Sequence, residues 1–317
     1  MFSCSGKRAE GTQSGYSNSQ NTTMVKLQTF DADSAYMYTK KQVDFGPRVP
    51  GTSAHKMCGD YLADELKRFG AKVIEQEADL KLYNGNIIRA KNIIGSFQPD
   101  NKNRILLCAH WDTRPFADHD PDRANHAKAI DGANDGAGSC AVLLEIARQI
   151  QIKQPEIGID IIFFDAEDWG VPSFEYNNYD ESGYCLGSEY WAKNPHVKNY
   201  TAKFGILLDM VGSPDAVFYK EYHSMKHAGN IVQKVWETAA GLGYGRYFIN
   251  AVGGSIEDDH VQIIKHRQIP CVDIIHYDPQ SATGFGTFWH TLNDNMDNIC
   301  KDTFKAVGET VLHVIYN

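Results

Sequence analysis

Gly158-Ile-Asp-Ile-Ile-Phe-Phe-Asp165-Ala-Glu-Asp168 is the stretch that decides the fold. Its first seven residues are mostly Ile and Phe, which is typical of a short β-strand that is buried on both faces. Acidic residues follow this strand at once, at Glu167 and Asp168. A buried strand that ends in charged side chains predicts a parallel sheet inside the protein, with polar chemistry at one edge of the sheet.

The segments around this strand repeat the same alternation. Further apolar runs predict strands at residues 104–110, 204–211 and 270–276. Residues 72–98 predict a hairpin that turns at Asn84-Gly85. Helical patterns occupy residues 31–43, 53–69, 135–150, 225–242 and 302–315. Strands alternating with helices predict a three-layer αβα fold with a central mixed, mostly parallel sheet.

The composition favours a single domain and argues against a nucleic-acid partner and a membrane span. The 317 residues are 42% hydrophobic with a net charge of −9, which suits one large domain and argues against a nucleic-acid surface. No apolar run reaches the roughly 20 residues that a membrane span needs. Residues 1–23 are rich in Gly, Ser, Asn and Gln, so we expect a disordered tether there and a single domain over 24–317.

The N-terminus offers two interpretations. Phe2-Ser3-Cys4 resembles the end of a bacterial lipobox, which implies a lipid anchor at Cys4 and a periplasmic or cell-envelope location. The alternative is an ordinary loose terminus. The other cysteines include no CxxC pair, so the sequence predicts neither a disulfide framework nor a zinc-thiolate site.

Acidic and imidazole side chains stand at or just beyond the predicted strands, or open the next helix. They are His110, Asp135, Glu167, Asp168, Asp209 and His290. Because parallel strands end at the same edge of a sheet, we expect these side chains to converge. Two imidazoles and several carboxylates at one place are ligands that Zn²⁺ prefers.

Each of these residues also has a simple structural interpretation. Asp135 is a candidate helix N-cap, Glu167 and Asp168 are candidate solvated loop acids, and His290 is a candidate loop histidine. Asp209 differs, because a carboxylate inside an apolar strand is costly to bury without a strong partner. The joint recurrence at strand ends favours a site. Five other histidines follow no predicted strand and are expected at the surface or in loops: His119, His126, His196, His223 and His227.

The order of these motifs resembles the zinc exopeptidases of the aminopeptidase type. The matching segments are Ala109-His-Trp-Asp112, Asn134-Asp-Gly-Ala137, Phe164-Asp-Ala-Glu-Asp168, Leu208-Asp-Met210 and Trp289-His-Thr291. The resemblance implies one zinc held by His110, Asp135 and Asp209. It implies a second zinc held by Asp135, Asp168 and His290, with Glu167 as general base.

Three further segments resemble the glutaminyl cyclases, which share this fold and bind a single catalytic zinc. They are Arg48-Val-Pro-Gly-Thr52, Ile256-Glu-Asp-Asp-His-Val261 and Trp289-His-Thr-Leu-Asn-Asp-Asn295. This resemblance implies zinc on Asp135, Asp168 and His290, and an acid/base role for Glu167. It also implies a hydrogen-bonded pair of Asp209 with Asp258, which share a proton, and a substrate pocket lined by Trp289.

The chain departs from the animal cyclases at several positions. Asp168 replaces their Glu, and Glu257 replaces their Gln. The cysteine that precedes the first histidine lies one residue earlier, at Cys108, on the opposite face of a regular strand. This shift argues against a disulfide with Cys140. The long loop at 169–184 is either a lid or a packed surface loop.

Three functions therefore remain open at this point. The first is a zinc enzyme that cyclises the N-terminal glutamine of peptides or proteins to pyroglutamate. The second is an aminopeptidase with two zinc ions, because every ligand type for two metals is present. The third is a binding domain of the same fold without activity, which the intact ligands and base disfavour.

Overall fold

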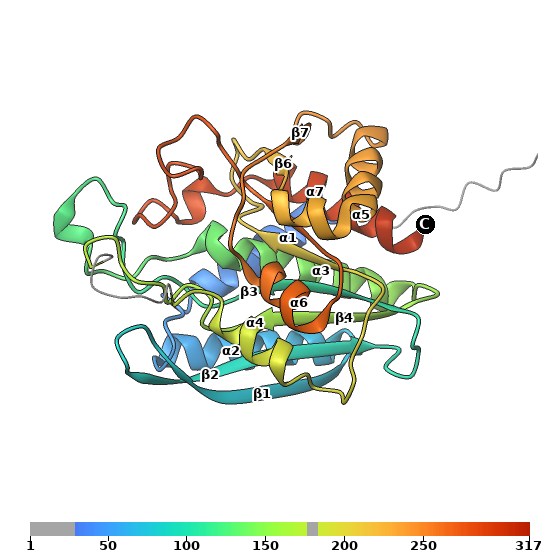
Figure 1. The fold of residues 1–317 in the computed structure, drawn as a ribbon, viewed down its shortest axis with the longest axis horizontal. Coiled ribbons are helices and arrows are strands. Elements are labelled where there is room, and N and C mark those ends of the chain that lie inside the picture. Colours follow the sequence, from blue (N-terminus) through green and yellow to red (C-terminus); the bar gives the residue numbers. More distant parts are fainter. Residues whose placement is uncertain (1–28, 176–182) are drawn as a thin grey trace, which may run out of the picture.

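A six-stranded sheet forms the centre of the computed structural model, which describes residues 29–175 and 183–317 (Figure 1). In spatial order the strands are β1 (Lys72–Lys81), β2 (Ile87–Phe97), β4 (Gly158–Phe164), β3 (Arg104–His110), β5 (Gly205–Asp209) and β8 (Cys271–Ile275). The last four strands are mutually parallel, whereas β2 runs antiparallel to both β1 and β4. The predicted mixed, mostly parallel sheet is confirmed. The predicted tether and Cys4 lie outside the described residues.

Helices cover both faces of this sheet. One face packs against α1 (Ala32–Val43), α2 (Ser53–Arg68), α3 (Ser139–Ile152), α5 (Tyr222–Gly241) and α7 (Lys301–Tyr316). The other face packs against α4 (Leu186–Lys193) and α6 (Asp259–Arg267), which lie in front of the sheet in Figure 1. Short 3₁₀ turns occur at Arg123–Asn125 and Met296–Asn298. Among the described helices, none is long and apolar enough to cross a membrane.

The two faces have separate apolar cores, which explains why the central strands carry apolar side chains on both faces. In β3, Ile105 and Leu107 belong to the core beneath α2 and α3, while Leu106 and Cys108 belong to the core beneath α4 and α6. Cys140 lies in the first of these cores. Cys108 and Cys140 are therefore on opposite faces of the sheet, and both are free thiols.

Local signals fix most of the element ends. The hydroxyl of Thr52 accepts a hydrogen bond from the backbone N–H of His55, which caps the start of α2. After α2 the chain turns at Gly70 with a φ of 91°, a left-handed conformation that favours glycine. The hairpin of β1 and β2 is joined by residues 82–86, a longer connection than the predicted two-residue turn.

The predicted helix at 135–150 is wrong at its start. Residues Ala133–Gly138 form a π-helical turn, and α3 begins only at Ser139. Asp135 has a φ of −105° and a ψ of 85°, so it interrupts the helical backbone instead of capping it. The carboxylate of Asp294 holds this turn, because it accepts the backbone N–H groups of Asn134 and Asp135 at 2.7 and 3.1 Å.

The sequence patterns also missed four short elements. These are α4, α6 and the two strands of a small parallel sheet, β6 (Phe218–Lys220) and β7 (Phe248–Val252). The helix predicted at 225–242 starts three residues earlier, at Tyr222, because the side chain of Glu221 caps it through the N–H groups of His223 and Ser224.

Candidate active site

The carboxyl ends of β3, β4 and β5 bring the predicted site residues together. His110 is the last residue of β3, and Asp209 is the last residue of β5. Glu167 and Asp168 follow β4 after two intervening residues. The loops that follow β3, β4 and β8 gather on the left side of the molecule in Figure 1. Tertiary packing therefore produces the convergence that the strand-end rule predicted.

Two groups of possible metal ligands share Asp135. In the first, the Nε2 atom of His110 lies 2.9 Å from Asp135 Oδ1 and 3.3 Å from Asp209 Oδ1. In the second, the Nε2 atom of His290 lies 3.2 Å from Asp168 Oδ1 and 3.8 Å from Asp135 Oδ2. The two oxygens of Asp135 thus face different groups, as in a bridging carboxylate.

The residues of these groups fit a bound metal ion. Both carboxylate oxygens of Asp168, Oδ1 of Asp209 and Nε2 of His110 are buried and form no well-directed hydrogen bond, although imidazole and carboxylate atoms lie close together. Buried polar atoms of this kind are rare in stable proteins, and a coordinated cation satisfies them. Two carboxylates and one imidazole form a donor set that suits a catalytic zinc with an open position. Asp135, Asp168 and His290 could therefore hold zinc, and His110 with Asp209 offers a second position.

A carboxylate supports the residues around His110. The two oxygens of Asp112 accept the backbone N–H groups of Glu167 and Asp168 at 3.0 and 3.2 Å. Oδ1 of Asp112 also lies 3.6 Å from Nδ1 of His110. One buried aspartate therefore fixes the segment after β4 and also places a carboxylate behind the imidazole at the end of β3, where outer carboxylates stand in metal sites.

A second carboxylate supports His290. Oδ1 of Asp118 lies 3.5 Å from His290 Nδ1, and Arg114 donates two hydrogen bonds to Asp118 at 3.0 and 2.9 Å. Burial raises the pKa of Asp118, but His290 and Arg114 outweigh that effect and hold the pKa well below its usual range. Asp118 is therefore a permanent anion behind the imidazole. Neither Asp112 nor Asp118 was identified as a site residue from sequence.

Close packing fixes the turn that carries Asp135. A Cβ atom at Gly136 would collide with the backbone oxygen and the imidazole of His110, so only glycine fits there. Burial and the charge of Asp135 raise the pKa of Asp294 to about 8. Asp294 lies in the segment 289–295 that the sequence singled out. Only the structure shows that it anchors the turn of Asp135.

Glu167 stands beside the second ligand group. Its Oε1 accepts a hydrogen bond from the thiol of Cys185 at 3.2 Å, and its backbone oxygen accepts the N–H of Cys185 at 2.9 Å. Burial raises the pKa of Glu167 well above its ordinary value. A carboxyl group with a raised pKa close to a candidate metal suits proton transfer near neutral pH.

Asp258 caps α6 and lies in the same region as Asp209. Its Oδ1 accepts the backbone N–H of Asp259 at 2.5 Å, while its Oδ2 is buried without a partner. Burial and the charge of Asp209 raise the pKa of Asp258 to about 7. Oδ1 of Asp209 also has no hydrogen-bond partner. The structure thus brings the two acids near each other, and the predicted shared hydrogen bond stays a prediction.

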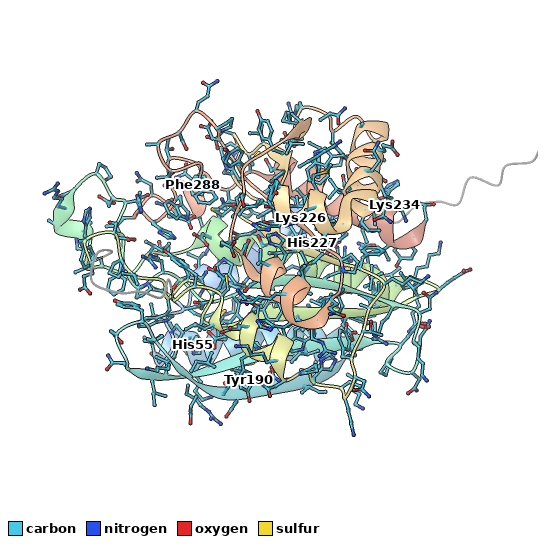
Figure 2. The ribbon with its side chains drawn as sticks, in the orientation of Figure 1. His55, Tyr190, Lys226, His227, Lys234 and Phe288 are labelled. Carbon is cyan, nitrogen blue, oxygen red and sulfur yellow. The ribbon has the colours of Figure 1, made fainter. Side chains whose placement is uncertain are left out.

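A cavity of about 520 Å³ opens over these residues. Its wall includes Trp289, whose ring stacks on His290 at 3.8 Å and lies 4.8 Å from Phe285. Phe288, labelled in Figure 2, is the buried member of this aromatic group. His119 also lines the cavity, with its ring 4.5 Å from Trp289. It is exposed in a loop, as predicted, but belongs to the site, which the sequence did not reveal.

The part of loop 169–184 that the structure describes also reaches this cavity. Val171, Ser173 and Tyr184 line it, while residues 176–182 lie outside the described part of the chain. Both interpretations of this loop, a lid or a packed surface loop, therefore remain predictions.

A buried imidazole with two carboxylate neighbours lies behind the acids of the site. The Nε2 atom of His260 is 3.1 Å from Glu221 Oε2, and its Nδ1 atom is 3.6 Å from Asp273 Oδ2. Oε1 of Glu221 also accepts the backbone N–H of Ile256 at 3.2 Å. Glu221 therefore ties the start of α5 to the segment that carries Asp258.

Replacing Glu221 by glutamine should lower the free energy of unfolding at pH 7 by roughly 1.5–3 kcal/mol, because charge-assisted hydrogen bonds are lost. Burial raises the pKa of Glu221, but the hydrogen bond from His260 and two backbone N–H groups outweigh it, and the pKa is about 2 against an ordinary 4.5. A carboxylate whose pKa is lowered by folding stabilises the folded state above about pH 4.5. This stabilisation is lost as the pH falls toward 2.

Urea unfolding of the wild type and of E221Q at several pH values measures this effect. The difference between them should shrink as the pH falls through that window. The matched control is E237Q on the exposed side of α5, which should unfold like the wild type. A constant difference between E221Q and the wild type down to pH 2 would contradict the role of the Glu221 charge.

The sheet and the shared-aspartate ligand groups define the class of the protein as a metal-dependent enzyme with the zinc exopeptidase fold. The family model of peptidase family M28 matches residues 92–315, and the chain belongs to this family.

Several proteins of known structure or assigned activity are similar to this chain over most of its length. The chain is 61% identical to Tannerella forsythia glutaminyl cyclase, with a TM-score of 0.90 over 92% of this chain and 99% of that one. It is 60% identical to a Zn-dependent exopeptidase from Parabacteroides distasonis, with a TM-score of 0.91 and the same coverage. It is also 25% identical to glutaminyl-peptide cyclotransferase of Bos taurus over 83% of this chain and 76% of that protein.

Proposed function

We propose that this chain converts the N-terminal glutamine of peptides and proteins into pyroglutamate and releases ammonia. The observation that carries the proposal is the group of Asp135, Asp168 and His290 beside Glu167, inside a cavity walled by Trp289. The relatives named glutaminyl cyclase and glutaminyl-peptide cyclotransferase support the same activity.

In this proposal each group of the site has one task. A zinc ion held by Asp135, Asp168 and His290 would act as a Lewis acid toward the side-chain carbonyl of glutamine. Trp289 offers a flat apolar wall that can hold the short glutamine side chain in the cavity. Asp118 and Asp112 keep His290 and the segment of Glu167 in place.

Proton transfer is the task of Glu167. The α-amine nitrogen forms a bond with the side-chain amide carbon, and the bond from that carbon to the amide nitrogen breaks. Glu167 takes the proton that the amine loses and gives it to the departing nitrogen, which leaves as ammonia. Its buried position and raised pKa suit a group that must hold a proton between these two steps.

We propose one zinc ion for each chain. A proton shared by Asp209 and Asp258 would make Asp209 a poor ligand, and the position at His110 and Asp209 would then hold no metal. Two zinc ions and hydrolysis by a bound water belong to the alternative, the aminopeptidase.

The test is to incubate metal-replete protein with a glutamine-initiated and a leucine-initiated peptide, and to follow ammonia and free amino acids. The expected result is ammonia and a pyroglutamyl peptide from the first peptide, and no release of leucine from the second. Release of free leucine or glutamine with two zinc ions per chain would establish the aminopeptidase. Zinc binding without turnover of either peptide would establish a binding domain.

Two further expectations belong to this proposal. Residues 24–317 act as one catalytic unit, and the chain works at the cell envelope with a lipid anchor on Cys4. The second rests on Phe2-Ser3-Cys4 alone, which lies outside the described residues.

A further inference from the structure

The rim of the cavity carries one carboxylate that the proposed chemistry does not use. Glu257 lines the cavity and its side chain is 73% exposed, whereas its neighbours Ile256 and Asp258 are only 9% and 4% exposed. The exposed Glu257 therefore stands at the mouth, between two residues that turn inward.

The fold holds this carboxylate in place through the backbone on both sides of it. The N–H of Ile256 donates to Glu221, and the oxygen of Gly254 accepts the N–H of Tyr222 at 3.0 Å. On the other side, Asp258 is the N-cap of α6. Because the main chain is fixed before and after Glu257, its side chain stays at the mouth of the cavity.

The charge of the mouth is negative. Seven acids line the cavity, and the described lining residues include no Lys or Arg. Six of these acids are those of the metal groups, the base and their supports: Asp118, Asp135, Glu167, Asp168, Asp209 and Asp258. Only Glu257 is directed to solvent. Its carboxylate lies 3.4 Å from Nε2 of His223, and this nitrogen also lies 2.8 Å from the hydroxyl of Ser255.

Two aromatic rings share the cavity with this carboxylate. Tyr277 and Phe285 line the same cavity, and a Cβ atom at Gly254 would lie about 3 Å from the ring of Tyr277. Aromatic faces attract cations, and they also pack against the methylene groups of Lys and Arg side chains. A basic side chain at the mouth could therefore lie along a ring and place its charge near Glu257.

We infer that Glu257 and these rings form a binding subsite for the residue after the N-terminal glutamine, and that this subsite takes Lys or Arg. The inference rests on the proposed function, which puts the glutamine side chain at Asp135, Asp168 and His290 in the depth of the cavity. The peptide must then leave through the mouth, past Glu257. The substrate class is thus glutamine-initiated chains with a basic second residue.

The test compares kcat/KM for three peptides of equal length that begin with Gln-Arg, Gln-Ala and Gln-Glu. At about 20 mM salt the Gln-Arg to Gln-Glu ratio should be roughly 5–20, and at about 0.5 M salt it should approach one, since rim charges are screened. In E257Q the low-salt ratio should fall to within about twofold of one. E257K should prefer the Gln-Glu peptide.

The matched control is E237Q, which changes the net charge equally at an exposed position of α5 that does not line the cavity. It should keep the wild-type ratio. If Gln-Ala is turned over but Gln-Arg and Gln-Glu react at equal rates, this inference is wrong and the proposed function stands. An unchanged Gln-Arg to Gln-Glu ratio in E257Q has the same consequence. No ammonia from any of the three peptides, Gln-Ala included, overturns the proposed function and this inference with it.

Discussion

Replacing Glu167 by glutamine is expected to lower kcat for glutamine cyclisation roughly 10²–10⁴-fold. The variant keeps the shape of the side chain and can still contact the thiol of Cys185, but it cannot accept and return a proton. Asp135, Asp168 and His290 are unchanged, so zinc should stay bound. The measurements are steady-state ammonia release and the zinc content of purified protein.

The matched control for this prediction is E189Q in the first turn of α4, which belongs to the same connection after β4. Glu189 does not line the cavity and pairs with Lys193, so its removal should leave kcat near the wild-type value. Turnover of E167Q close to that of E189Q would remove Glu167 from the reaction. Loss of zinc from E167Q would instead assign it to the metal.

Replacing His290 by alanine should abolish zinc binding together with activity. His290 is the single imidazole of its group, and two carboxylates alone bind zinc far more weakly than a three-ligand set. Zinc at 100 times its dissociation constant stabilises a protein by about 2.7 kcal/mol, so added zinc should raise the melting temperature of the wild type and not of H290A. Elemental analysis and thermal unfolding with and without zinc measure both effects.

Two further variants test whether the loss of zinc is specific to His290. H227A changes an exposed histidine of α5, labelled in Figure 2, and should keep both zinc and activity. H110N removes an imidazole from the other group and should keep about one zinc per chain if a single ion binds. Full zinc content in H290A would refute the ligand assignment. A fall from two zinc ions to one in H110N would favour the aminopeptidase.

The sheet was predictable because buried parallel strands are apolar at most positions on both faces, and because helices are periodic. The short elements were not. α6 opens with Asp259 and His260 and contributes only Ile263 to the buried apolar core, so it shows a weak helical pattern. His260, in its first turn, pairs with the buried Glu221 instead of an apolar surface. β6 and β7 have three and five residues, too few for a periodic signal.

The sequence by itself determined the layers of the fold and the residues that end its strands, since both follow from local patterns and the geometry of parallel sheets. Only the tertiary structure decided which acids support the site. Asp294 is 160 positions from Asn134, whose N–H it accepts, and Glu221 is 39 positions from His260. No local pattern encodes such pairs. They form because packing buries these groups together, where each needs a partner in place of water.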